Sequence, residues 1–304
     1  MLRPSGSWVA IATPFTPDDE VAFEGFHETI DFQAGHGTSA LLVMGSTGET
    51  SMLSIDERRE IIKRVAPYAK GKVPTFFGVT CSNTKETIKL ARFAEENEAD
   101  GVLFVIPSYI RPPQEAVFQF FKTVMQSVSI PTAVYNNPIR VGVNIDPATI
   151  ARLVDECPNF VADKEAMPNV SQLADVLSLT KGKLHVLCCD YPAYSITIPT
   201  LGLGGHGTAN IGGNIIPEEM AAMSRPWRTF EDVERTREIF FKYYALLKML
   251  YSVTNPVAVK AALGILGLPC GKPRLPLPEM APDRMAEMRR LMDELGVTEK
   301  YKVR

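Results

Sequence analysis

The chain has 304 residues, a formal net charge of −3 at pH 7, and a composition of 45% hydrophobic and 22% charged residues. These values are ordinary for a globular protein, and the length suits one large domain or one and a half. Acids and bases are mixed along the chain, so no basic stripe predicts nucleic-acid binding, and no apolar run approaches the length of a membrane span. The first residues lack the long apolar core of a signal peptide, and we expect a cytoplasmic protein.

The cysteines and histidines do not form a recognisable metal or disulfide pattern. An odd number of cysteines with no Cys-x-x-Cys spacing argues against a disulfide framework and against a zinc site. We therefore expect buried thiols in a reducing compartment, and no metal. The five cysteines are Cys81, Cys157, Cys188, Cys189 and Cys270.

Short apolar runs rich in β-formers recur at a steady interval. Most are continuous rather than alternating, which is typical of parallel strands that are covered on both faces. The eight runs are Trp8–Phe15, Ala40–Gly45, Thr75–Thr80, Gly101–Pro107, Thr132–Asn137, Asn159–Lys164, Leu184–Cys189 and Gly207–Ile211.

Helical patterns lie between these runs. Strand-helix alternation eight times over predicts a (β/α)8 TIM barrel. A doubly wound open sheet is the alternative, but no Gly-x-Gly-x-x-Gly follows the first strand to favour it. The predicted helices are Phe23–Ala34, Ser54–Ala66, Thr84–Glu96, Gln114–Gln126, Pro147–Asp155, Val170–Ser178, Tyr191–Leu201 and Glu218–Ser224.

After about residue 226 the alternation stops. The remaining sequence predicts three helices, over Phe230–Leu250, Pro256–Leu266 and Asp283–Leu295, with several prolines before the last one. We therefore predict a catalytic barrel over residues 1–225 and a C-terminal helical subdomain over residues 226–304 that packs on the barrel.

Lys164 ends one of the strand-like runs and stands between Asp163 and Glu165. A lysine that points into a closed sheet is costly as a cation, because burial disfavours the charged form. A neutral amine is a nucleophile that forms a Schiff base with a carbonyl compound. The alternative interpretation is a surface lysine that pairs with Glu165.

Other polar residues follow the predicted strands at the end where barrels of this kind carry their chemistry. The turn Gly45–Glu49 combines two glycines with the hydroxyls of Ser46 and Thr47, and such convergent donors suit a carboxylate, although a plain turn is equally consistent. Tyr109 and Tyr135 stand at two further strand ends, where a tyrosine more often serves core packing.

Three motifs carry a family resemblance: Gly45–Glu49, Tyr135 in the context Tyr-Asn-x-Pro, and Lys164-Glu165-Ala166. With them, the chain resembles the dihydrodipicolinate synthase / N-acetylneuraminate lyase family of pyruvate-dependent class I aldolases over nearly its whole length. The resemblance implies a barrel with a C-terminal helical bundle, assembled as a homotetramer of two tight dimers.

The resemblance also implies roles for single residues. Lys164 would form the Schiff base with pyruvate, so that no separate cofactor is needed. Tyr135 would shuttle protons, Ser46 would occupy the relay hydroxyl position, and Tyr109 would reach across the dimer interface into the neighbouring site. The substrate-binding residues would be Thr47, Gly45, Gly48, Arg140 and Ala209.

The identity of the second substrate depends on the residues around this core. Arg140 stands where synthases bind the carboxylate of aspartate semialdehyde. Ser46, however, replaces the threonine that is usual in synthases. The run Cys188-Cys189-Asp190-Tyr191 replaces their usual Ser-Gly-Asp-Asp-like run, and Asp163 replaces an apolar residue. These departures border the pocket for the second substrate and leave the pyruvate half intact.

Three hypotheses follow. The first is a 4-hydroxy-tetrahydrodipicolinate synthase, which condenses pyruvate with aspartate semialdehyde in lysine biosynthesis. The second is a lyase of the same family that acts on another 2-oxo acid, such as a 2-keto-3-deoxy sugar acid aldolase or dehydratase, or an N-acetylneuraminate lyase. The third is a non-catalytic barrel that binds a keto acid, against which the complete lysine, tyrosine and hydroxyl set argues.

Overall fold

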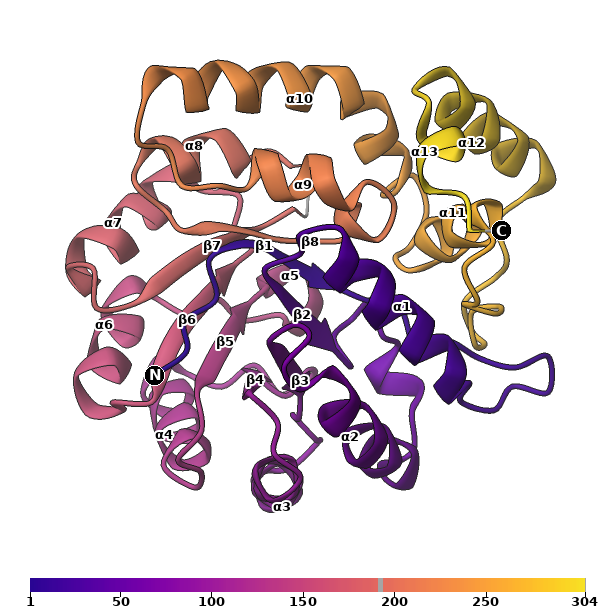
Figure 1. Ribbon diagram of the computed structural model, residues 1–304. Coiled ribbons are helices and arrows are strands. Elements are labelled where there is room, and N and C mark those ends of the chain that lie inside the picture. Colours follow the sequence, from indigo (N-terminus) through magenta and orange to yellow (C-terminus); the bar gives the residue numbers. More distant parts are fainter. Residues whose placement is uncertain (191–193, 304) are drawn as a thin grey trace.

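The computed structural model describes residues 1–190 and 194–303. Within these ranges, eight parallel strands close into a barrel in chain order (Figure 1). The last strand pairs with the first, Gly207 opposite Gly6, which confirms the predicted barrel and excludes an open sheet. The strands are β1 Gly6–Ala10, β2 Ala40–Val43, β3 Thr75–Gly78, β4 Gly101–Val105, β5 Thr132–Asn136, β6 Phe160–Glu165, β7 His185–Cys189 and β8 Gly207–Asn210.

Helices surround the barrel and cover its outer face (Figure 1). They are α1 Phe23–Gly35, α2 Ile55–Ala69, α3 Thr84–Glu96, α4 Gln114–Met125, α5 Pro138–Val141, α6 Pro147–Glu156, α7 Val170–Thr180, α8 Thr197–Gly202 and α9 Pro217–Met223. The short α5 was not predicted; Asn137 caps it and Pro138 opens it, and four residues are too few to show a helical period.

The strands are buried on both faces because successive side chains point to opposite sides. On β1, Trp8 and Ala10 belong to the cluster that fills the barrel, whereas Val9 packs in the outer layer beneath the helices. Neighbouring strands repeat this division, with Leu42 inside and Val43 outside on β2. This explains why the strands read as continuous apolar runs.

Several predicted strands end one or two residues earlier in the structure, and two elements differ more from their prediction. The first strand spans Gly6–Ala10 rather than Trp8–Phe15, and Pro14 could not have donated a ladder hydrogen bond within the predicted span. The helix predicted over Tyr191–Leu201 begins outside the described residues, and α8 is observed from Thr197 to Gly202.

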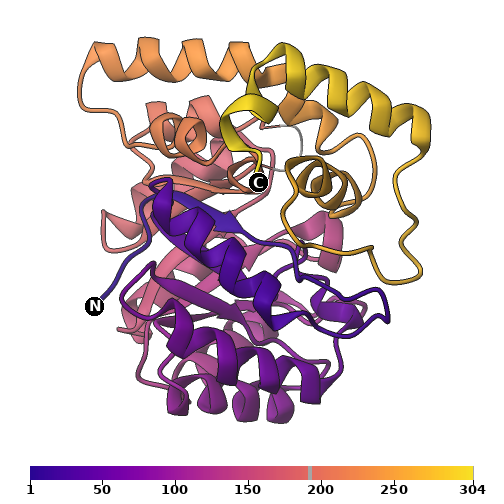
Figure 2. The same ribbon diagram turned by 45° about the vertical axis from the view of Figure 1, so that its right-hand side comes forward.

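The described part of the C-terminal tail contains four helices rather than three: α10 Phe230–Met249, α11 Val257–Leu266, α12 Pro282–Glu294 and α13 Val297–Tyr301. Gly296, with φ 72°, ends α12 and starts α13, whose five residues are too short for a periodic signal. Figure 2 shows the connection from α11 to α12 running down beside the loop after β1, where the Phe15 N–H donates to the Cys270 carbonyl at 3.2 Å. The tail thus packs directly against the barrel.

Candidate active site

Lys164 points into the barrel from β6. Strand pairing sets it beside Tyr135 of β5 and Leu187 of β7. The residue is 3% exposed, and its Nζ lies 4.5 Å from the centroid of the Tyr135 ring. Over residues 1–190 and 194–303, no carboxylate lies within ion-pair distance of this amine. Within the described residues, Lys164 is therefore a buried amine that belongs to no ion pair.

The acids that flank Lys164 point away from it. Asp163 lies opposite Val134 and Val186, two residues of the outer layer, so its carboxyl is buried behind the barrel wall. Glu165 shares that outer face and accepts hydrogen bonds from Asn136 at 3.0 Å and from other donors. The surface pair of Lys164 with Glu165 is therefore not formed. Burial raises the pKa of Glu165 to about 7 and that of Asp163 well above its usual range.

A second buried lysine shows the contrast. Lys260 of α11 is 3% exposed and its Nζ lies 2.6 Å from Glu49 Oε1, with side chains that are 1% and 0% exposed. It also donates to the Lys272 carbonyl at 3.1 Å. Lys260 is thus neutralised by a structural partner, which leaves Lys164 as the lysine available for chemistry.

The Gly45–Glu49 turn follows β2 and is held from two sides. Thr13 Oγ1 donates to the Gly48 carbonyl at 2.7 Å, and the Asn255 side-chain amide donates to Thr47 Oγ1 at 3.0 Å. A side chain at position 48 would be crowded, because a Cβ there would lie 3.0 Å from the Met44 backbone. Gly45 and Thr47 are buried, and Ser46 is partly exposed. The turn is fixed before any substrate arrives.

Tyr135 lies at the end of β5 with its ring against Lys164. Its Oη accepts a hydrogen bond from Asn137 Nδ2 at 2.6 Å and lies 3.6 Å from Cys189 Sγ. In the described residues it makes no hydrogen bond to Ser46. Burial raises the pKa of the phenol well above its usual range, whereas the charge of Arg140 and the bond from Asn137 oppose that shift.

The other predicted residues lie at different depths. Ala209 of β8 is fully buried inside the barrel. Arg140 is exposed on α5 and close enough to Tyr135 for its charge to act there. Tyr109 is 96% exposed with φ 85°, and Ile110 beside it is 64% exposed. Within one chain, therefore, Tyr109 does not join the group around Lys164.

Four further residues complete the site; three were not predicted, and Asp190 was expected only at the border of the second-substrate pocket. Asn137 bonds to Tyr135, and Asn255 bonds to Thr47. Asp190, fully buried after β7, accepts from the Tyr251 hydroxyl at 2.6 Å. The position of Asp190 at a strand end could have signalled it. Tyr251 and Asn255 lie between α10 and α11, and nothing in the sequence connects them with the barrel.

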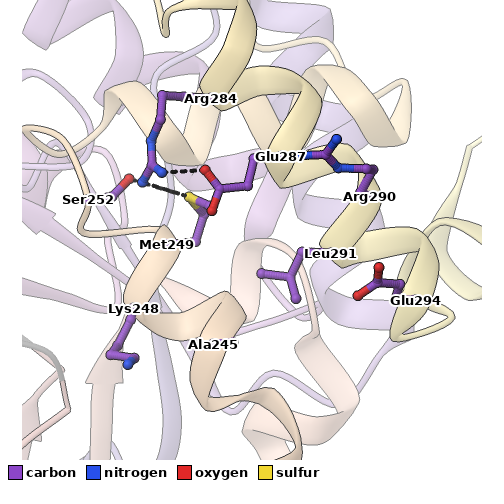
Figure 3. Close-up of a pocket in the computed structure, with 9 residues that line it drawn as sticks. All are labelled: Ala245, Lys248, Met249, Ser252, Arg284, Glu287, Arg290, Leu291 and Glu294. Carbon is purple, nitrogen blue, oxygen red and sulfur yellow. Dashed lines mark hydrogen bonds and ion pairs between the residues drawn. The ribbon is translucent and has the colours of Figure 1, made fainter.

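A second hollow is the groove between α10 and α12, which several charged side chains line (Figure 3). Arg284 bonds to Glu287 and to the Met249 sulfur, so its charge is already engaged. All residues that line the groove belong to the C-terminal helices or the segment after α10.

Among the described residues, no group of three or more histidine, cysteine or acidic side chains is arranged to hold a metal. No helix among them is both long and apolar enough to span a membrane. The barrel mouth is therefore the candidate active site.

Comparison with known proteins decides the family. The model of the dihydrodipicolinate synthetase family matches residues 3–295. The chain belongs to the dihydrodipicolinate synthetase family. A relative of this family, the 4-hydroxy-tetrahydrodipicolinate synthase of Methanocaldococcus jannaschii, is 36% identical over 292 residues, which cover 96% of this chain and 99% of the relative.

Solved structures of dihydrodipicolinate synthases share the fold. The crystal structure of the Aquifex aeolicus enzyme superposes with a TM-score of 0.91 at 35% identity and covers 97% of this chain and 99% of that chain. The structure of the Acinetobacter baumannii enzyme, a complex with pyruvate, gives a TM-score of 0.88 at 30% identity, with coverages of 97% and 99%. The family and its barrel are thereby shown for this protein.

Proposed function

We propose that this protein is a 4-hydroxy-tetrahydrodipicolinate synthase, a lyase of the class I aldolase type that condenses pyruvate with aspartate semialdehyde through a Schiff base on Lys164. The observation that carries the proposal is the buried Lys164 amine, which lies 4.5 Å from the Tyr135 ring and has no carboxylate partner among the described residues. Relatives that carry this name match over nearly the whole chain.

The reaction needs only groups that the barrel mouth supplies. The amine of Lys164 attacks the keto carbon of pyruvate, and loss of water leaves an imine. The imine draws electrons from the neighbouring methyl group, which loses a proton and becomes a nucleophilic enamine. Tyr135, whose ring lies 4.5 Å from the Lys164 amine, would act as general acid and base. Thr47 and the glycine backbone of its turn would receive the pyruvate carboxylate, within a lining that includes Ala209.

Arg140 would receive the carboxylate of the aldehyde substrate. It stands on the exposed first turn after β5, where a second substrate would enter above the imine. A guanidinium suits this task because it remains charged and can bind a carboxylate through two parallel hydrogen bonds.

The residues at the end of β7 favour a second candidate function. Cys189, which lies next to Asp190 at this strand end, stands where the synthase pattern has glycine, and Ser46 stands in place of threonine. A cleavage reaction on a 2-keto-3-deoxy sugar acid or on N-acetylneuraminate would use the same lysine and tyrosine. Only the aldehyde fragment would differ.

The assembly and the location of the enzyme are part of the same proposal. A homotetramer would cover Tyr109 and Ile110, which are 96% and 64% exposed in a single chain. All five cysteines lie within the described residues and all are free thiols, which supports a reducing compartment such as the cytoplasm.

Two experiments test the proposal. Borohydride with pyruvate should fix a reduced pyruvyl group on Lys164, found by peptide mass spectrometry. No adduct, or an adduct on Lys260, would overturn the central assignment. A coupled assay should then compare condensation with aspartate semialdehyde against cleavage of N-acetylneuraminate and 2-keto-3-deoxygluconate, and faster turnover of either sugar acid would favour the second candidate.

A further inference from the structure

A chain of buried polar groups runs from Tyr135 to a carboxyl group that the reaction above does not use. Tyr135 Oη lies 3.6 Å from Cys189 Sγ, which in turn lies 3.6 Å from Asp190 Oδ1. The Tyr251 hydroxyl donates to that same oxygen at 2.6 Å. Tyr135, Cys189 and Asp190 are 6%, 2% and 0% exposed, so bulk water does not compete along the chain.

Asn137 fixes the direction of this chain. Its Oδ1 accepts from the Arg140 backbone N–H at 3.1 Å, so its Nδ2 must be the atom that faces Tyr135, at 2.6 Å. An amide nitrogen can only donate, and the phenol oxygen must therefore accept. The phenolic proton is thus directed away from Asn137, and Cys189 is a partner within reach.

Asp190 forms the far end of the chain. Its Oδ2 accepts from the Ile211 N–H at 2.5 Å. Burial raises the pKa of this carboxyl group, and the charge of Lys164 and the bond from Tyr251 oppose the shift. The phenol of Tyr194 also faces it. A carboxyl group held in such surroundings is suited to take and return a proton.

We propose that Cys189 relays protons between Tyr135 and Asp190 during the pyruvate half-reaction. The relay rests on the proposed function and uses the contact of Tyr135 with Cys189. Cys189 and Asp190 act through Tyr135 and are positioning residues. Only Tyr135 exchanges a proton with the substrate.

The proton balance closes within the half-reaction. Loss of water from the carbinolamine on Lys164 consumes one proton, which Tyr135 gives to the leaving hydroxyl. Tyr135 regains a proton from the Cys189 thiol, and the thiolate regains one from Asp190. When the imine loses a methyl proton, Tyr135 accepts it and the same steps run in reverse. The relay requires Asp190 to begin as the neutral acid, and it ends in the same state; no oxidant or reductant is needed.

Hydrogen exchange into pyruvate tests the relay without the aldehyde substrate. In D2O the enzyme should replace the pyruvate methyl protons by deuterium, which NMR follows directly. Cys189→Ala should slow this exchange by about 10²-fold, the lower end of general acid-base contributions. Cys189→Ser keeps a donor and acceptor of similar size and should recover exchange to within about tenfold of the parent.

Cys188→Ala is the matched control. Cys188 is the neighbouring fully buried thiol, and its Sγ lies 3.7 Å from the Gly207 carbonyl rather than near Tyr135. Cys188→Ala removes the same sulfur atom volume as Cys189→Ala, and it should leave hydrogen exchange into pyruvate within twofold of the parent. An equal loss in both alanine variants would overturn the relay, because it would trace the effect to packing.

Borohydride trapping distinguishes a failure of the relay from a failure of the proposed function. If the parent forms a pyruvate adduct on Lys164 and Cys189→Ala still exchanges within twofold, the relay is overturned alone. If the parent forms no adduct, the proposed function falls and the relay with it. An unchanged adduct yield in Cys189→Ala at equilibrium, together with slow exchange, supports the relay.

Discussion

Replacing Lys260 with methionine is expected to destabilise the protein far more than replacing Lys164. Lys260 and Glu49 form an ion pair of 2.6 Å whose side chains are 1% and 0% exposed. Removal of the lysine leaves the Glu49 carboxylate in the interior, with the Arg274 backbone N–H at 2.8 Å as a remaining donor. Breaking a buried pair in this way costs about 3–5 kcal/mol.

Lys164→Met is the matched comparison. This lysine is equally buried but forms no ion pair with a carboxylate among the described residues, so methionine breaks no such pair. The side chains have similar volume, and such a replacement should cost less than about 1.5 kcal/mol. In a third variant, Glu49→Gln combined with Lys260→Met should recover part of the loss, because an unpaired amide costs less to bury than an unpaired carboxylate.

Guanidinium unfolding followed by circular dichroism measures all three variants. The protomer concentration must be kept constant, because assembly contributes to the apparent stability. Equal losses for the two single methionine variants would refute the argument that pairing distinguishes the lysines. A greater loss in the double variant than in Lys260→Met would refute the attribution of that cost to the stranded Glu49 charge.

Three further predictions concern the site and its surroundings. Tyr135→Phe should lower turnover by about 10²–10⁴-fold with the fold intact, and activity within twofold would remove Tyr135 from the proton path. Asp163 is buried and has no hydrogen-bond partner among the described residues, so Asp163→Val should stabilise the protein by about 1–3 kcal/mol in urea unfolding at pH 7. Since the pKa of Asp163 is raised in the folded state, the parent protein loses stability as pH rises above about 4. The stability gained by Asp163→Val should therefore be larger at pH 8 than at pH 5. Destabilisation by Asp163→Val at both pH values would contradict this. Mixing inactive Tyr109→Phe and Lys164→Ala subunits should restore some activity, and no recovery after proven subunit exchange would place Tyr109 outside a shared site.

The barrel could be predicted from the sequence because its signals are local. Eight apolar runs separated by helical patterns require only the period of each segment and the burial of parallel strands on both faces. The motif residues could be placed for a similar reason, since Lys164, Tyr135 and the Gly45–Glu49 turn each lie at a strand end, and strand ends meet at one mouth.

The orientation and partners of the side chains depended on the closed barrel. Pairing with β5 and β7 turned Lys164 inward and its flanking acids outward, although all three are adjacent in sequence. Thr47 and Asn255 are 208 positions apart, and only the packing of the C-terminal segment brings them together. The chain from Tyr135 through Cys189 to Asp190 likewise exists only because β5 and β7 both flank β6. Periodicity fixes which face of an element is buried, but register and closure decide which residues meet across it.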